Sequence, residues 1–226
     1  MSLILNIDTA AEKAHVSLAK DGLVLSSLFS ESQKEHASFL QSAIQQLTKI
    51  TGVQLSAVDA VAVTAGPGSY TGLRVGFASA KGLCYALKKP LITPGTLEVL
   101  TASAIQVSSD MDESVLLCPM IDARRMEIFT AIYKKSLETY LAPSSMILDK
   151  LSFEKELTKN KILFFGTGSD KWKAVCTHTN ALFAVVDILP DAMSKYSNML
   201  YLQKHYTELA YSEPFYLKEF QTVIKK

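Results

Sequence analysis

The chain has 226 residues, 48% of them hydrophobic and 20% charged, a composition that is typical of folded globular proteins and argues against intrinsic disorder. Its 23 Lys and Arg residues nearly balance its 22 Asp and Glu residues. The resulting net charge of +1 gives no support to strong direct binding of nucleic acid, because phosphate contacts need a concentrated set of basic side chains. If the protein serves RNA, we expect a partner protein to make most of the contacts.

Signals for export or membrane insertion are not found in the sequence, which predicts a cytoplasmic protein without membrane contact. The first residues carry no basic region followed by a long apolar run, and no stretch of about 18 apolar residues occurs. The cysteines Cys84, Cys118 and Cys176 are far apart and form no C-x-x-C pair. An odd number of such cysteines is typical of a reducing compartment.

The first half of the chain is predicted to alternate short strands with helices. Five β-rich runs are expected there, at residues 3–8, 14–20, 23–30, 58–64 and 91–92. Asp21-Gly22 separates the second run from the third, which is typical of an antiparallel hairpin. Apolar residues at helical spacing predict one helix from residue 35 and another over residues 73–87.

A polar stretch at residues 107–113 is interpreted as the boundary between two lobes. This division assigns residues 1–106 to an N-terminal lobe and residues 107–226 to a smaller C-terminal lobe, and it leaves open that the last segment packs back onto the first lobe. In the second half, strands are expected at residues 115–121, 128–133 and 162–165. Residues 191–204 are expected to form a helix. Its predicted inner face consists of Met193, Tyr196, Leu200 and His205.

A glycine-rich turn at residues 66–72 joins the fourth strand run to the second helix. Backbone N–H groups at a helix N-terminus bind anions well, so the turn resembles a phosphate loop. A Walker loop ends in Gly-Lys-Ser/Thr, however, whereas Gly72 is followed by Leu73 and Arg74. The glycine spacing also differs from the dinucleotide-binding fingerprint. A phosphate site and a tight turn that lets the helix pack closely both remain open.

The dipeptide Asp8-Thr9 ends the first strand, at the position where actin-like ATPases hold magnesium and phosphate. The same dipeptide is common in turns in which a side chain caps the backbone, so this alternative also remains. The four histidines are scattered and show no metal-ligand spacing. The sequence contains no G-x-S-x-G elbow that would indicate a serine nucleophile.

Together these segments resemble one family. Residues 61–76, with the run GPGSYTGLRVG at positions 66–76, resemble the signature of the TsaB (YeaZ) family. Supporting matches lie at residues 3–9, 36–37, 80–83, 96–98, 122–125 and 214–218. The resemblance covers nearly the whole chain and is loose over residues 136–205.

The resemblance implies an α/β fold of the actin-like, sugar-kinase and Hsp70 type (the ASKHA fold), with two lobes that each hold a mixed sheet flanked by helices. It also implies a non-catalytic scaffold that binds and activates TsaD and works with the ATPase TsaE. That complex forms threonylcarbamoyladenosine next to the anticodon in tRNAs that read codons beginning with A. The chain is then expected to reach tRNA only through the complex, and a homodimer of the isolated chain stays open.

The resemblance further implies that this chain has no catalytic residues. TsaD carries a metal site with two histidines in the segment that corresponds to residues 96–100, where this chain has Thr96 and Leu100. Neither side chain supplies the imidazole nitrogen that such a site needs. We therefore expect no metal site, no required cofactor, and at most weak binding of ATP or ADP in a degenerate cleft. The residues predicted for this nucleotide or anion cleft are Asp8, Thr9, Gly66, Gly68, Ser69, Asp122, Arg124 and Arg125.

The first two helices form the shared interface in this family. The side chains predicted to bind the partner are His36, Leu40, Ile44, Leu47, Leu73, Phe77 and Ala80. We expect part of this set to be exposed, because the second helix is apolar on more sides than one sheet can bury. The alternative is that these residues form the core.

Two other functions are consistent with parts of the sequence. An ATP-dependent phosphotransferase of the acetate- or sugar-kinase type would keep the fold, but it needs a pair of metal-binding aspartates and a catalytic base. A metallopeptidase is suggested only by analogy between folds, and the missing histidines count against it.

Overall fold

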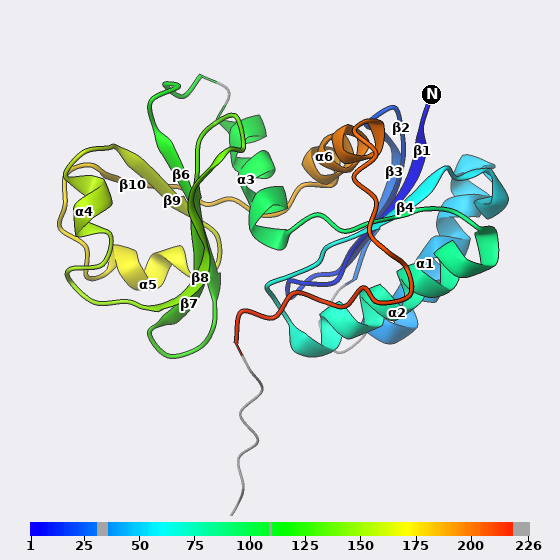
Figure 1. The fold of residues 1–226 in the computed structure, drawn as a ribbon, viewed down its shortest axis with the longest axis horizontal. Helices are drawn as coiled ribbons and strands as arrows, with labels where there is room; N and C mark the ends of the chain where they lie inside the picture. The colour runs from blue at the N-terminus through cyan, green and yellow to red at the C-terminus, as the bar shows by residue number, and fades with distance from the viewer. Residues whose placement is uncertain (31–35, 109, 219–226) are drawn as a thin grey trace, which may run out of the picture.

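The computed structural model describes residues 1–30, 36–108 and 110–218 and contains two lobes, each built around a five-stranded sheet (Figure 1). The first sheet has the strand order β3-β2-β1-β4-β5. Its strands are β1 (Leu3–Asp8), β2 (His15–Lys20), β3 (Leu23–Phe29), β4 (Ala60–Val63) and β5 (Leu91–Ile92). All five β-rich runs that were predicted for this half of the chain are confirmed.

The second sheet repeats the topology of the first. Its order is β10-β9-β6-β7-β8. Its strands are β6 (Leu116–Asp122), β7 (Glu127–Tyr133), β8 (Thr139–Ile147), β9 (Ile162–Phe165) and β10 (Ala181–Phe183). In each sheet the first strand is central, the next two form an antiparallel meander on one side, and the last two lie parallel on the other. This repeated topology confirms the predicted two-lobed α/β fold of the actin-like type.

Helices cover both sheets. Those in the described residues are α1 (His36–Thr51), α2 (Tyr70–Leu87), α3 (Thr96–Val107), α4 (Glu154–Leu157), α5 (Ser169–Lys173) and α6 (Pro190–Leu202), with a short 3-10 turn at Leu55–Ala57. The helices α1 and α2 pack on one face of the first sheet, and α6 packs on the other face (Figure 1). The helix α2 begins three residues before its predicted start because the Ser69 hydroxyl accepts a hydrogen bond from the N–H of Gly72 and caps it.

The helix α3 and the strands β8 and β10 were not predicted. Much of α3 is buried, on more than one side, so its sequence lacks the polar stripe that marks a surface helix. Along β8, exposed and partly buried residues mix with only moderate apolar content, which gives a weak strand signal. Neighbouring segments bury α3, whereas β8 and β10 are edge strands that form by pairing with β7 and β9. In each case the structure depends on a partner segment and not on the element's own sequence alone.

The inner face of α6 is more polar than the sequence predicted. The structure buries Met193, partly buries Tyr196 and Leu200, and exposes His205. The buried serines Ser194 and Ser197 face the sheet. Ser197 Oγ donates to Asn6 Oδ1 at 2.5 Å, and Asn6 Nδ2 donates to Ser194 Oγ at 3.2 Å. A search for apolar periodicity does not count small hydroxyl side chains, which is why this face was only partly found.

Most side chains that were predicted to be available to a partner lie in the core of the first lobe. Six of them are at most 3% exposed: Leu40, Ile44, Leu47, Leu73, Phe77 and Ala80. Their predicted exposure is wrong, because α1 and α2 turn these residues toward the sheet, where Leu5 and Val16 belong to the same apolar cluster. His36 begins α1, but its side chain lies outside the described residues.

The division of the chain after residue 106 remains a prediction. The second sheet lies entirely beyond that point, but α6 and the segment after it lie against the first lobe (Figure 1). In the part of the chain that the structure describes, no helix is both long enough and apolar enough to cross a membrane.

Burial separates the three cysteines into two classes. It raises the pKa of Cys84 to about 11 and that of Cys118 to about 12, whereas Cys176 is partly exposed. Because the thiolate is the reactive form, we expect iodoacetamide at pH 8 to modify Cys176 in the folded protein and all three cysteines after denaturation. Peptide mass spectrometry measures this. Fast modification of Cys118 before unfolding would contradict the packing described here.

Candidate functional site: the cleft between the lobes

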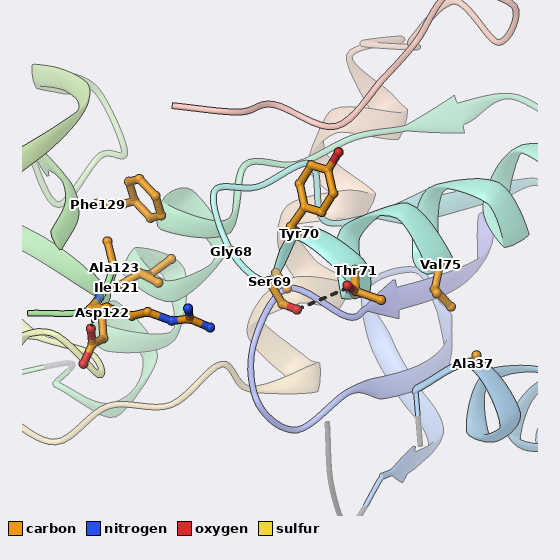
Figure 2. Close-up of a pocket in the computed structure, with 13 residues that line it drawn as sticks. Ala37, Gly68, Ser69, Tyr70, Thr71, Val75, Ile121, Asp122, Ala123 and Phe129 are labelled. Carbon is orange, nitrogen blue, oxygen red and sulfur yellow. Dashed lines mark hydrogen bonds between the residues drawn. The ribbon is translucent and has the colours of Figure 1, made fainter. Parts of the chain in front are cut away.

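A cavity of about 660 Å³ lies between the two lobes (Figure 2). The first lobe lines it with Ala10, Ala37, Gly68, Ser69, Tyr70, Thr71, Gly72 and Val75. The second lobe lines it with Ile121, Asp122, Ala123, Arg124 and Phe129. Of the residues predicted for the cleft, the structure brings together Gly68, Ser69, Asp122 and Arg124 in this lining. It does not include Asp8, Thr9, Gly66 or Arg125.

The glycine turn before α2 packs directly against the loop that follows β1. The backbone N–H of Ser69 donates to the carbonyl oxygen of Ala10 at 2.7 Å. A Cβ atom at Gly68 would lie only 2.5 Å from the same oxygen, so a larger residue would separate the two loops. The N–H of Gly72 donates to the Ser69 hydroxyl at 3.2 Å. These two amides bond within the chain rather than facing a ligand, which favours close packing as the role of the turn.

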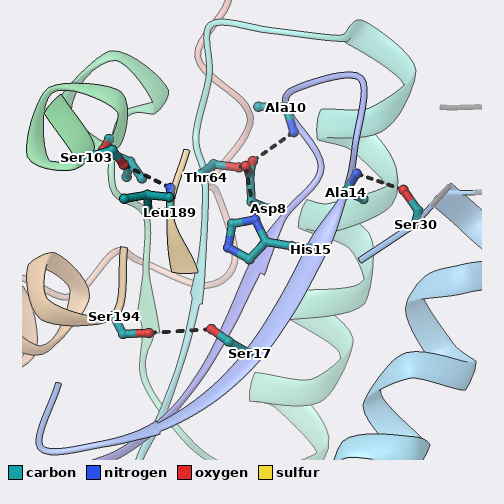
Figure 3. A network of polar contacts seen from close by, with 11 residues as sticks. Asp8, Ala10, Ala14, His15, Ser17, Ser30, Thr64, Ser103, Leu189 and Ser194 are labelled. Carbon is teal, nitrogen blue, oxygen red and sulfur yellow. Dashed lines mark hydrogen bonds and ion pairs between the residues drawn. The ribbon is translucent and has the colours of Figure 1, made fainter. Parts of the chain in front are cut away.

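Asp8 is buried in the first lobe and does not face the cavity (Figure 3). Its Oδ1 atom accepts hydrogen bonds from the Thr64 hydroxyl at 2.7 Å and from the N–H of Ala10 at 3.0 Å. Its Oδ2 atom lies 3.6 Å from Nδ1 of His15, whose pKa is lowered by burial and raised in part by the carboxylate. Oδ1 of Asp8 therefore holds the loop after β1 in place, while Oδ2 is buried and has no hydrogen-bond partner among the described residues.

The neighbouring residue Thr9 is also fully buried, and its hydroxyl has no hydrogen-bond partner among the described residues. It lies against Gly76 of α2, where a Cβ atom would overlap it. Gly66 is similarly enclosed, because a Cβ atom there would lie 2.6 Å from the carbonyl oxygen of Phe215. Its φ of 111° also falls in the region that favours glycine.

Asp122 and Arg124 supply the charges of the second lobe. The Oδ1 atom of Asp122 lies 2.5 Å from Nζ of Lys171 and accepts from the N–H of Arg124 at 2.5 Å. Arg124 and Arg125 have φ values of 72° and 51°, which place both in the tight turn between β6 and β7. The carboxylate therefore organises the turn, and the guanidinium of Arg124 is the cation that the second lobe places beside the cavity.

The positions that correspond to metal-binding histidines belong to the start of α3. Thr96 is 2% exposed and donates its N–H to the carbonyl of Gly66 at 2.9 Å. Leu100 is 5% exposed and belongs to an apolar cluster beneath the second sheet. Among the described residues, no group of three or more His, Cys, Asp and Glu side chains is placed to hold a metal ion.

Two aromatic residues of the cavity were not among the predicted site residues. Tyr70 on α2 and Phe129 on β7 lie on opposite sides of it (Figure 2). Tyr70 belongs to the glycine motif, which is a signal that could have identified it. Phe129 lies between the buried residues Ile128 and Thr130 on β7, so its side chain points to the opposite face of the sheet. The strand pattern alone does not indicate that this face lines a cavity.

Comparison with known proteins identifies related families. A family model described as tRNA N6-adenosine threonylcarbamoyltransferase (TsaD) matches residues 28–219. Curated proteins named tRNA threonylcarbamoyladenosine biosynthesis protein TsaB also match. The Haemophilus influenzae protein is 28% identical over 95% of this chain and 93% of its own length. The Bacillus subtilis protein is 29% identical over 72% of this chain and 70% of its own length.

Solved structures agree with the fold. The structure of YeaZ from Pseudomonas aeruginosa superposes with a TM-score of 0.79 and 25% identity, covering 96% of this chain and 100% of its own. An inorganic polyphosphate/ATP-glucomannokinase from an Arthrobacter strain, 9% identical, superposes with a TM-score of 0.52 over 91% of this chain and 100% of its own, which shows the fold alone. Since the TsaD family model spans most of the chain, and a curated TsaB protein and YeaZ are similar to it over nearly its whole length, the chain belongs to the TsaD family and, within it, to the TsaB (YeaZ) proteins.

Proposed function

We propose that this chain is a non-catalytic partner subunit in the formation of threonylcarbamoyladenosine next to the anticodon of tRNAs that read codons beginning with A. It binds and activates a TsaD-type subunit, works with the ATPase TsaE, and reaches tRNA through that complex. The names of the curated relatives support a role in threonylcarbamoyladenosine biosynthesis. The match to the TsaD family model supports a structural relationship with the catalytic subunit.

The observation that carries the non-catalytic role is the contact between Ala10 and the glycine turn. The 2.7 Å hydrogen bond from Ser69 to the Ala10 carbonyl joins the two loops between which a kinase of this fold would hold phosphates. Asp8, the carboxylate that was expected to hold magnesium, does not line the cavity, and its Oδ1 atom accepts hydrogen bonds from Thr64 and the backbone. Among the described residues that line the cavity, the one carboxylate is that of Asp122, and it is paired with Lys171. These contacts disfavour the alternative phosphotransferase, which needs a metal-binding aspartate and a general base at the cavity.

The partner surface is proposed on the outer face of α1 and α2, with residues other than those predicted. Ala78 and Gly82 are exposed one turn apart on α2, and a Cβ atom at Gly82 would meet nothing within 4 Å. Tyr85 continues the same side of the helix and is 81% exposed. Small residues let a partner helix approach closely, and an exposed tyrosine supplies contact area. A second copy of the chain could use the same face when the subunit is alone.

Charge supports an electrostatic component to this association. Residues 36–97 contain five Lys or Arg residues and one Asp, although the whole chain carries only +1. This segment, which contains α1 and α2, is therefore cationic, while the remainder of the chain is slightly acidic. Exposed charges are screened by salt, so we expect binding to the TsaD-type subunit to weaken as the salt concentration rises.

Replacing Ala78 by Arg is expected to weaken binding to the TsaD-type subunit of the same organism at least about tenfold, because a long charged side chain prevents close approach at the centre of the face. Surface plasmon resonance measures the affinity, and a tRNA modification assay measures the consequence. Ala142→Arg on β8 is the matched control, since Ala142 is exposed on the other lobe. The proposed surface is wrong if both variants bind as tightly as the unchanged chain.

The role itself is tested by ATP hydrolysis and by complementation of the modification reaction. We expect the purified chain alone to hydrolyse no ATP, and we expect tRNA modification by TsaD and TsaE to need it. Turnover of about 1 per second by the chain alone, a rate typical of enzymes, would instead support the phosphotransferase. Full modification in the absence of the chain would overturn the partner role.

A further inference from the structure

The segment that follows α6 runs along the first lobe from β5 to the cleft (Figure 1). We name residues 207–218 the strap. Its start is fixed at the sheet, where the N–H of Thr207 donates to the Leu91 carbonyl at 2.8 Å. Its middle is held by Lys81 of α2, whose Nζ atom donates to the carbonyl oxygens of Ala210 at 3.2 Å and Ser212 at 2.8 Å. The strap therefore belongs mechanically to the first lobe, although it ends the described chain.

Near its end the strap supports one wall of the cavity. The N–H of Phe215 donates to the Ala65 carbonyl at 2.7 Å, just before the glycine turn. The hydroxyl of Tyr216 accepts from Nε of Arg74 at 3.3 Å. The centre of the Tyr70 ring lies 5.3 Å from the centre of the Tyr216 ring and 4.0 Å from the Arg74 guanidinium. Tyr70, which lines the cavity, is thus held from behind by the strap.

The strap then reaches the second lobe. Nζ of Lys218 lies 2.6 Å from Oε2 of Glu127, the first residue of β7. The side chain of Glu127 is 19% exposed and that of Lys218 is 48% exposed, so the carboxylate is partly shielded from water. Two residues further along β7, Phe129 forms the opposite wall of the cavity. A single short segment therefore contacts both walls.

We infer that the strap sets the opening of the cleft, and that Tyr216 and Lys218 are its positioning residues. This inference does not depend on the proposed role beside TsaD. Lobes of one chain are expected to move relative to each other unless a large apolar interface joins them. A contact made in only one arrangement favours that arrangement by its own free energy. The backbone of the strap is already anchored at Phe215 and further upstream, so Lys218 loses less conformational entropy when it pairs with Glu127. This ion pair is therefore expected to contribute more free energy than one between two mobile side chains.

The inference also gives a structural role to a segment of the sequence that the proposed function leaves unexplained. Residues 214–218 match the family pattern although they lie far from the glycine motif in sequence. In the structure these residues contact the glycine turn, α2 and β7 at once. Proximity to both walls accounts for the tyrosine and the lysine in this segment, because an aromatic hydroxyl reaches Arg74 and a long cationic side chain spans to Glu127.

The test measures the distance between the lobes in the full-length chain. Spin labels are attached to Gln46→Cys on α1 and Ala142→Cys on β8, both exposed positions, in a Cys176→Ser background. Double electron-electron resonance then reports the distribution of distances. We expect one dominant distance for the unchanged chain. For Lys218→Glu we expect the ratio of the more open to the less open arrangement to rise by about fivefold.

A charge exchange distinguishes positioning from general destabilisation. Glu127→Lys alone should broaden the distribution as Lys218→Glu does, and the double variant should restore the original distance. Lys134→Glu is the control, because Lys134 pairs with Glu138 at 2.8 Å within the second lobe and touches no strap residue in the described contacts. Tyr216→Ala should remove the contact that supports Tyr70 and should also widen the distribution of distances between the lobes.

Thermal melts of all variants establish that the lobes remain folded during the measurement. The inference is overturned if Lys218→Glu and Glu127→Lys, both folded, give the same distribution as the unchanged chain. It is also overturned if the double variant fails to restore the distance, or if Lys134→Glu changes it as much as Lys218→Glu does.

Discussion

Phe77→Asp is expected to abolish the cooperative folding of the first lobe. Phe77 is 3% exposed and lies in the cluster that joins α1, α2 and the sheet. Removing a buried aromatic side chain costs about 3–5 kcal/mol, and an unpaired buried carboxylate adds several more. Since a typical domain is stable by only about 5–15 kcal/mol, the sum is comparable to the whole free energy of unfolding. Circular dichroism during heating measures the loss of the transition.

The matched control is Ala78→Asp, one residue along the same helix. Ala78 is exposed, so this change places the same carboxylate in water and should alter the free energy of unfolding by no more than about 0.5–1 kcal/mol. Ile44→Asp on α1, at a site that is 3% exposed, should behave like Phe77→Asp. A cooperative melt at the original temperature for Phe77→Asp, with loss of binding to the TsaD-type subunit, would instead return Phe77 to the partner surface.

Two glycines of α2 are expected to respond in opposite directions to replacement by alanine. At Gly76 a Cβ atom would overlap Oγ1 of Thr9 and lie 3.2 Å from Val63, so the helix would have to move away from β1 and β4. Overpacking of this kind costs about 1–3 kcal/mol. At Gly82 a Cβ atom meets nothing, so Gly82→Ala should stabilise the helix by up to about 1 kcal/mol through its higher helix propensity.

Urea denaturation of both glycine variants measures these changes in the free energy of unfolding. The double variant Thr9→Ala with Gly76→Ala tests the cause, because removal of the Thr9 hydroxyl should relieve part of the strain and make the two changes non-additive. Equal stabilisation of the chain by Gly76→Ala and Gly82→Ala would contradict the close contact of α2 with the loop after β1.

The sequence by itself determined the features that depend on near neighbours. The runs that became β1 to β5 were found because strand patterning is local, and α1 and α2 were found from helical spacing. The glycine motif at residues 66–76 carried the family because only glycine fits where Gly68 meets Ala10 and Gly76 meets Thr9. The lack of histidines at Thr96 and Leu100 was likewise visible without a structure.

Only the tertiary structure decided which surface each residue faces. The stripe of Ile44 and Phe77 is apolar whether it meets a sheet or a partner, and the packing of both helices on β1 and β2 made it core. The same holds for Asp8, whose carboxylate turned to Thr64 rather than to the cleft. Periodicity reports that a face is apolar or polar, but burial depends on segments distant in the sequence.

The cleft itself shows this dependence most clearly. Its walls come from α2 and β7, and the strap that contacts both comes from the end of the described chain. No local pattern links Tyr70, Phe129 and Tyr216, because they come together only after two separate sheets have formed and the chain has returned to the first lobe. The arrangement of such a site follows from long-range packing, and a single sequence read segment by segment does not contain it.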